Sequence, residues 1–155
     1  MVLCCAEPPG SEIAQPLAIR ETEIRACEPL RILLVEDTRE GADLVRVFLA
    51  GHPEDLFHIE WISDLVDAMF RLQHDGIDVV LLDLGLPEID GDRSFLAIKG
   101  MTEGRIPIVI LTADDRRSSK DLILASGAAE YLTKQNISAL ELRGALRRAA
   151  LHLVP

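Results

Sequence analysis

Hydrophobic positions along the chain change their pattern near residue 30. From Leu30 onward, short apolar runs alternate with amphipathic stretches, which is typical of strands and helices that alternate around a parallel sheet. Strands that helices cover on both faces are apolar at every position. Three runs have this character: Ile32 to Val35, Val79 to Leu82 and Ile108 to Leu111. We expect them to be the central strands of the sheet.

Two other runs have the mixed character of strands at the edge of a sheet. Apolar and polar side chains alternate in residues 57–61, and the short run of residues 130–132 begins with a glutamate. An edge strand has one side open to solvent, so charged side chains are tolerated there. We expect these runs to be the two edge strands.

Five amphipathic stretches follow the five runs, and each is predicted to be a helix. Ser63 is a candidate N-cap of the second helix, and Gly127 ends the fourth. Ser138 and Glu141 have the spacing of a capping box at the start of the last. In chain order the helices cover about residues 42–49, 65–72, 93–99, 115–126 and 138–149.

The alternation of five strands with five helices defines the expected fold. With the second and fifth strands at the edges, right-handed crossovers are satisfied most simply by the strand order 2-1-3-4-5. We therefore predict an α/β protein with a flavodoxin-like, doubly wound (βα)5 fold, a parallel sheet between two layers of helices.

The length and composition indicate one folded domain with an N-terminal extension. The chain has 155 residues, of which 48% are apolar, enough for one domain with its own core. Residues 1–29 contain four of the eight prolines and have no sustained apolar period. We expect residues 1–29 to be a flexible extension and residues 30–155 to form the domain.

Charge and cysteine content limit the partners and the compartment. A net charge of −10 argues against nucleic acid, which is bound through Lys and Arg. No apolar run is long enough for a membrane helix. Cys4, Cys5 and Cys27 are odd in number and two are adjacent, so a disulfide framework is not expected. We expect a soluble, cytoplasmic protein, and a metal or lipid role for these cysteines stays open.

Polar side chains follow the predicted central strands, where ligands bind in open α/β sheets. Glu36 and Asp37 end the first strand, and Asp83 ends the third. Thr112 ends the fourth strand, and Lys134 follows the fifth. Taken singly, each has an ordinary explanation as a turn former, a helix cap or a solvated charge. Their common position at one rim of the sheet favours a functional site.

The chemistry of these side chains indicates a metal ion and a phosphoryl group. Carboxylates held close together repel one another unless a cation relieves them, and an all-oxygen set suits Mg²⁺. Lys134 and Thr112 then remain for phosphoryl oxygens. Asp83, at the centre of the rim, is the best-placed nucleophile for forming an acyl phosphate.

Four segments carry a combined motif: LLVED (33–37), LDLGLPEIDG (82–91), LTA (111–113) and YLTK (131–134). Together they resemble the receiver domain of two-component response regulators, over about residues 30–151. The resemblance implies that Asp83 accepts a phosphoryl group from a histidine kinase or a histidine phosphotransfer protein. It also implies that Asp37, Asp83 and the Gly85 carbonyl bind Mg²⁺, with Glu36 acting partly through water.

The same resemblance implies a conformational switch. Lys134 and Thr112 would contact the phosphoryl oxygens, and Tyr131 would turn inward as Thr112 moves toward them. The surface of the fourth helix, fifth strand and fifth helix would then change for binding of a downstream protein or for homodimerisation. Apart from phosphoryl transfer from the donor and slow autodephosphorylation, the resemblance implies no enzyme activity.

Three positions concern the family pattern: one departs from it, and two bear on the lifetime of the acyl phosphate. Gln135 stands where family members usually have proline after the lysine, so we expect a trans peptide bond there. Gly85 and Asp114 occupy positions that influence the lifetime of the acyl phosphate in the family.

Other functions fit the residues less well. The alternative is a degenerate receiver that binds a partner without phosphorylation. Gln135, in place of the usual proline, is compatible with this alternative. A phosphatase of the haloacid dehalogenase class needs an acid two residues after its nucleophile, and Gly85 stands there. No output domain is recognised after the last helix, so we expect output through another protein.

Overall fold

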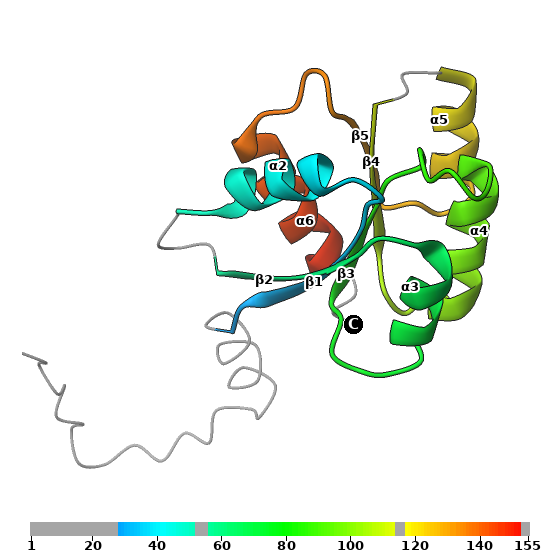
Figure 1. Ribbon diagram of the computed structural model, residues 1–155, viewed down its shortest axis with the longest axis horizontal. Coiled ribbons are helices and arrows are strands. Elements are labelled where there is room, and N and C mark those ends of the chain that lie inside the picture. The colour runs from blue at the N-terminus through cyan, green and yellow to red at the C-terminus, as the bar shows by residue number, and fades with distance from the viewer. Residues whose placement is uncertain (1–27, 52–55, 114–116, 153–155) are drawn as a thin grey trace, which may run out of the picture.

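The computed structural model describes residues 28–51, 56–113 and 117–152, without the side chains of 117 and 118. Within that part of the chain, strands and helices alternate from β1 to α6 (Figure 1). The predicted extension lies outside the described residues up to position 27, as do the three cysteines and Asp114. No described helix combines the length and apolar character needed to cross a membrane.

The five strands form one parallel sheet in the order β2-β1-β3-β4-β5. This order confirms the prediction, with β2 and β5 at the edges. Every residue of β3 and β4 is buried, as expected for strands covered on both faces. The strands are β1 (Leu30–Val35), β2 (Phe57–Ile62), β3 (Val79–Leu82), β4 (Ile108–Thr112) and β5 (Glu130–Thr133).

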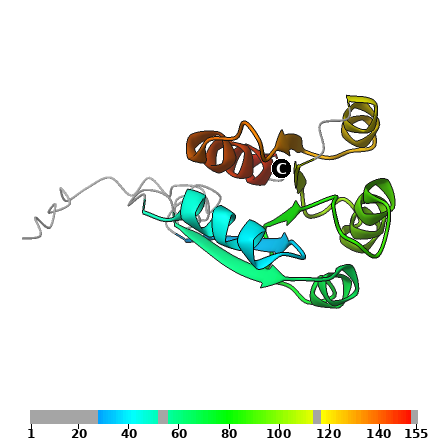
Figure 2. The same cartoon turned by 45° about the horizontal axis from the view of Figure 1, so that its top comes forward.

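Helices cover the two faces of the sheet and complete three layers (Figure 2). On one face, α2 (Arg39–Leu49) and α6 (Ala139–Leu151) pack over Ile32 and Leu34. On the other face, three helices pack over Leu33 and Val35. Successive strand residues point to opposite faces, so a continuous apolar run supplies both cores. The three helices are α3 (Leu65–Arg71), α4 (Gly91–Thr102) and α5 (Arg117–Ala125).

The helix ends follow local side-chain chemistry. The capping box of α6 is confirmed, with Ser138 and Glu141 each accepting from the other's backbone N–H. The prediction that Ser63 caps α3 is wrong. Asp64 is the N-cap instead, and its carboxylate accepts from the Asp67 N–H at 2.8 Å. A carboxylate is as good a cap as a hydroxyl and also favours the helix dipole.

Helix α4 is longer at both ends than the predicted residues 93–99. It begins at Gly91, where a Cβ would lie 2.7 Å from Leu84 Cβ and 2.9 Å from the Leu84 carbonyl oxygen. Glycine there lets the helix start directly against the loop that follows β3. The helix ends where Glu103 adopts a left-handed conformation, with φ of 51°.

Candidate functional site

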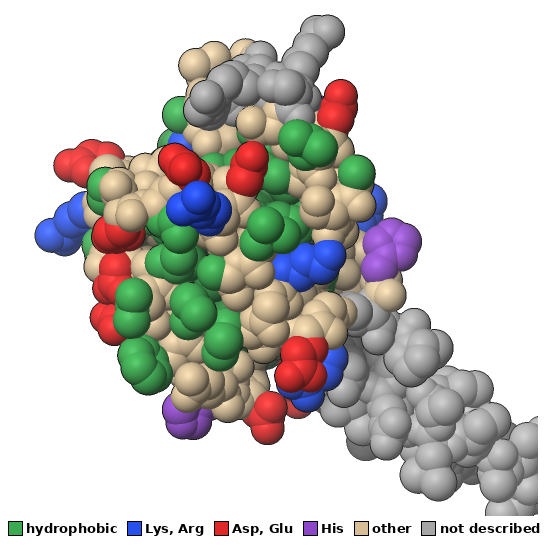
Figure 3. Space-filling model, turned by 90° about the vertical axis from the view of Figure 1, so that its right-hand side faces the viewer, with side chains coloured by type: hydrophobic (Ala, Val, Ile, Leu, Met, Phe, Trp, Pro, Cys, Tyr) green, Lys and Arg blue, Asp and Glu red, His purple; other side chains and the backbone are tan. Residues whose placement is uncertain are grey.

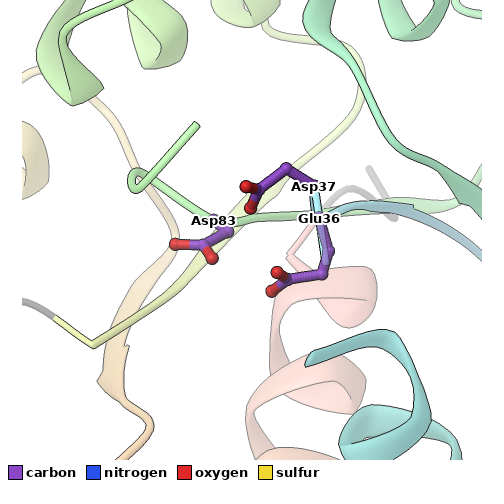
Figure 4. A group of neighbouring side chains, drawn as sticks. All are labelled: Glu36, Asp37 and Asp83. Carbon is purple, nitrogen blue, oxygen red and sulfur yellow. The ribbon is translucent and has the colours of Figure 1, made fainter. Parts of the chain in front are cut away.

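The carboxylates of Glu36, Asp37 and Asp83 meet at the rim of the sheet, as predicted (Figure 4). The register pairs Val35 with Leu82, so the residues that follow β1 and β3 emerge side by side. One oxygen from each carboxylate lies within 4.8 Å of the others. Glu36 and Asp83 are buried, and Asp37 is half-buried. The acidic cluster therefore extends from two buried carboxylates to one that is partly exposed to solvent.

Asp83 is held at the centre by both of its carboxylate oxygens. Oδ1 accepts from the Gly85 N–H at 2.9 Å, and Oδ2 accepts from Lys134 Nζ at 2.7 Å. Burial raises the pKa of the Asp83 carboxyl, and this outweighs the opposing hydrogen bonds from Lys134 and Gly85. Asp83 is therefore a carboxylate with little hydration and an ordered geometry, as a nucleophile requires.

Glu36 is more deeply buried than Asp83, and burial and hydrogen bonds affect the pKa of its carboxyl in a different proportion. Its Oε2 accepts from Lys134 Nζ at 2.5 Å, and its Oε1 accepts from Thr38 Oγ1 at 2.8 Å. Burial raises the pKa of the Glu36 carboxyl, but the hydrogen bonds from Lys134 and Thr38 outweigh it, so that the pKa lies below its usual value. Glu36 is accordingly the more strongly ionised of these two buried acids.

Lys134 follows the edge strand β5, whereas Glu36 and Asp83 follow the inner strands β1 and β3. Its ammonium nevertheless binds both carboxylates at the rim of the sheet. Its side chain is 18% exposed. Burial lowers the pKa of the Lys134 ammonium, but hydrogen bonds to the two carboxylates outweigh this effect and raise it. Lys134 therefore stays charged. One ammonium among three carboxylates still leaves the site negative, which favours a further cation.

The donor set fits a hard divalent ion. The cluster offers carboxylate oxygens, and no His or Cys side chain joins it among the described residues. Such a set suits Mg²⁺, which takes few protein ligands and keeps several water or phosphate oxygens. Gly85 follows Asp83 in the same loop, and a Cβ there would lie 3.3 Å from Asp83 Oδ1.

Thr112 and Tyr131 lie on the neighbouring strands. Thr112 ends β4 and is 1% exposed, and its carbonyl oxygen accepts from the Lys134 N–H at 2.8 Å. Tyr131 is 7% exposed and packs into the core shared with α4 and α5, with Lys120 Nζ 5.7 Å from its ring centre. The Lys134–Gln135 bond is trans, as predicted. Tyr131 thus points inward in this structure.

Three residues of the site were not predicted from the sequence. Thr38 is the N-cap of α2 and binds Glu36, a role its position before a helix could have suggested. Gly41 lies inside α2 against the Glu36 carboxylate, and a glycine in a helical pattern is itself a signal of close packing. Trp61 donates from Nε1 to the Glu36 carbonyl oxygen at 2.7 Å. No sequence pattern marks the Trp61 contact, because it joins β2 to the loop after β1, 25 residues away in sequence.

The sequence matches one protein family over most of its length. The family described as the response regulator receiver domain matches residues 32–147. The swarming motility regulation protein RssB of Serratia marcescens is 41% identical over 107 residues, which are 68% of this chain and 46% of RssB. The chain therefore spans about half the length of that relative.

Solved structures agree with this match. A CheY-like receiver domain protein from Methanospirillum hungatei JF-1 has a TM-score of 0.69 at 17% identity, covering 81% of this chain and 97% of that one, and supports the fold. The Mn²⁺-bound form of response regulator Rcp1 has a TM-score of 0.62 at 28% identity, and the match covers 81% of this chain and 96% of Rcp1. With five parallel strands in receiver order and an acidic cluster at the rim, the chain belongs to the response regulator receiver domain family of two-component systems.

Proposed function

We propose that the chain is a phosphoacceptor switch in which Asp83 receives a phosphoryl group from the phosphohistidine of a histidine kinase or a histidine phosphotransfer protein. The observation that carries this proposal is the geometry of Asp83. Its two carboxylate oxygens are bound by the Gly85 N–H and by Lys134, at the point where β1 and β3 bring three carboxylates together.

The transfer needs a nucleophile and compensation of charge. A carboxylate oxygen of Asp83 attacks phosphorus, the nitrogen–phosphorus bond of the donor breaks, and its electron pair returns to the imidazole, which takes up a proton. The Lys134 ammonium, 2.7 Å from Asp83 Oδ2, is placed to neutralise charge on the transferred oxygens. Thr112, at the end of β4, is the hydroxyl donor for one of these oxygens.

The acidic cluster is the proposed Mg²⁺ site. Asp37, Asp83 and the Gly85 carbonyl would bind the ion directly, and Glu36 would bind it partly through water. Mg²⁺, when bound, supplies positive charge to the oxygens of the transferred group. Response regulator Rcp1, which shares this fold, has been solved in an Mn²⁺-bound form, and this supports a divalent cation in the present chain.

The proposed output is a change in the surface formed by α5, β5 and α6. An acyl phosphate adds about 1.5 to 2 negative charges and new acceptors beside Thr112 and Lys134, whose segments lead into α5 and α6. In this mechanism Tyr131 couples the site to that surface. Figure 3 shows the side of the molecule that carries α4 and α5, where hydrophobic and charged side chains are interspersed. Leu122 of α5 is 63% exposed. A downstream protein or a second copy of the chain would bind this surface.

The other expectations become part of the same proposal. Residues 30–155 act as the receiver domain, and residues 1–29 contribute nothing to the site. The protein works in the cytoplasm, binds no nucleic acid and has no enzyme activity beyond its own phosphorylation and slow dephosphorylation. Gly85 and Asp114 set the lifetime of the acyl phosphate.

The test is the mass of the intact protein after incubation with a small-molecule phosphodonor, with and without Mg²⁺. We expect one phosphoryl adduct that requires Mg²⁺ and disappears in Asp83→Asn. Asp43→Asn is the matched control, because Asp43 is 55% exposed on α2 and the same chemical change there should leave the adduct intact. A folded wild-type protein without an adduct would contradict the proposal and favour a receiver that binds its partner without phosphorylation.

A further inference from the structure

The Glu36 carboxylate is bent back onto the first turn of α2, where Thr38 and Gly41 enclose it. Thr38 donates to Oε1 twice, from Oγ1 at 2.8 Å and from its backbone N–H at 3.2 Å. Lys134 Nζ donates to the other carboxylate oxygen, Oε2. Thr38 thus fixes the rotation of the carboxylate and leaves Oε2 facing Lys134 and the centre of the site.

Gly41 supplies the space for this position. A Cβ at Gly41 would lie 2.3 Å from Glu36 Cδ and 2.5 and 2.6 Å from its two oxygens, closer than any real contact. Glycine is a poor helix former, so its presence inside α2 needs a packing reason. The space required by the Glu36 carboxylate is that reason.

We infer that Thr38 and Gly41 are positioning residues that allow a glutamate, one methylene longer than an aspartate, to serve in the acidic cluster. This inference rests on the proposed Mg²⁺ site. A glutamate has one more rotatable bond than an aspartate, and fixing that bond costs side-chain entropy when an ion binds. Thr38 and Gly41 hold the bond in place before the ion arrives, so that the cost is not added to binding.

Thr38 has a second role that must be separated from this one. Its Oγ1 also accepts from the Gly41 N–H at 3.1 Å and so caps α2. Loss of the cap lowers the stability of the helix whatever residue stands at position 36. Loss of positioning weakens Mg²⁺ binding only when the longer side chain is present. The two roles therefore differ in their dependence on Glu36.

The experiment is a calorimetric titration of the full chain with Mg²⁺, on variants at Thr38 with and without Glu36→Asp. We expect Thr38→Val to weaken Mg²⁺ binding about tenfold, the lower end for an outer-shell partner of a metal ligand. Thr38→Ser keeps the hydroxyl and should restore the affinity to within about twofold of wild type. With Glu36→Asp present, Thr38→Val should change the affinity less than about twofold, since the shorter side chain does not reach Oγ1. Thermal unfolding should show the loss of the cap in both cases.

Gly41→Ala independently tests whether the Glu36 carboxylate needs the space that glycine leaves at position 41. Alone it should weaken Mg²⁺ binding at least as much as Thr38→Val, and Glu36→Asp should relieve most of that loss. Circular dichroism of each variant verifies that it is folded. Wild-type affinity in Thr38→Val, or an equal loss with and without Glu36→Asp, would overturn this inference and leave the proposed Mg²⁺ site intact. A wild-type chain that binds no Mg²⁺ would overturn the proposed site and this inference with it.

Discussion

Replacement of Lys134 by methionine removes the cation that lies between two buried carboxylates. Glu36 and Asp83 are 2% and 9% exposed in their side chains, and Lys134 Nζ lies 2.5 and 2.7 Å from their oxygens. Methionine keeps a similar volume and chain length, so the change acts through charge. The carboxylates then face each other without compensation, and we expect the folded state to lose stability.

The size of this loss follows from the two ion pairs. Each pair is worth about 4 kcal/mol at a separation of charge centres of about 4 Å and an effective dielectric constant of about 20. Desolvation of the lysine offsets a large part of this attraction, and its 18% exposure reduces it further. We expect a net loss of about 2–3 kcal/mol near pH 7 without Mg²⁺. For about 120 ordered residues this corresponds to a fall in Tm of about 8–12 °C.

The pH dependence of the loss has a definite sign. In wild type the pKa of Glu36 lies below and that of Asp83 above its usual value, so their contributions to stability have opposite slopes with pH. Without the hydrogen bonds from Lys134, burial and mutual repulsion raise both pKa values. A carboxyl with a raised folded-state pKa destabilises the fold above that pKa, and the penalty fades as pH falls. The deficit should therefore be largest near pH 7 and smaller near pH 5.

The assay is urea and thermal unfolding of wild type and Lys134→Met, followed by circular dichroism in EDTA at several pH values. Lys134→Met with Asp83→Asn should recover most of the loss, because one carboxylate is then neutral. Arg39→Met, which removes a cation 80% exposed and 3.8 Å from its partner, should change stability by less than about 0.5 kcal/mol. Unchanged stability in Lys134→Met, or a deficit that grows toward pH 5, would refute the reasoning.

Further predictions concern a helix cap, the core and a spectroscopic signal. Ser138→Ala removes the acceptor for the Glu141 N–H and should lower the free energy of unfolding by about 1 kcal/mol; a change below about 0.3 kcal/mol by urea denaturation would contradict this. Phe95→Ala, at a side chain that is 1% exposed between α4 and the sheet, should cost about 3–5 kcal/mol in the same assay, and a loss below about 1 kcal/mol would mean that the site repacks. Mg²⁺ should change the fluorescence of Trp61, the only tryptophan, because its indole N–H binds the Glu36 carbonyl oxygen at 2.7 Å. Constant emission while calorimetry reports saturation would show that the ion does not perturb this contact.

The strands, their order and the acidic residues of the site could be predicted because each depends on a pattern that is local in the sequence. Apolar runs such as 79–82 identify strands buried on both faces, and the mixed runs identify the edges. The ends of parallel strands meet at one rim, so Asp83 could be placed beside Glu36 without coordinates. Helix ends were predicted less well, since Ser63 and Asp64 are both good caps and only the backbone conformation selects between them.

What the sequence determined by itself is the set of chemical groups at the rim, because residue type and strand position are enough to bring them there. What only the tertiary structure decided is how these groups are paired. Lys134 lies 98 residues from Glu36 in sequence and contacts it directly, and Thr38 and Gly41 enclose the carboxylate from the next helix. Such contacts depend on side-chain rotamers and on distances of a few tenths of an ångström. Those quantities arise from the packing of the whole domain and leave no periodic mark on the chain.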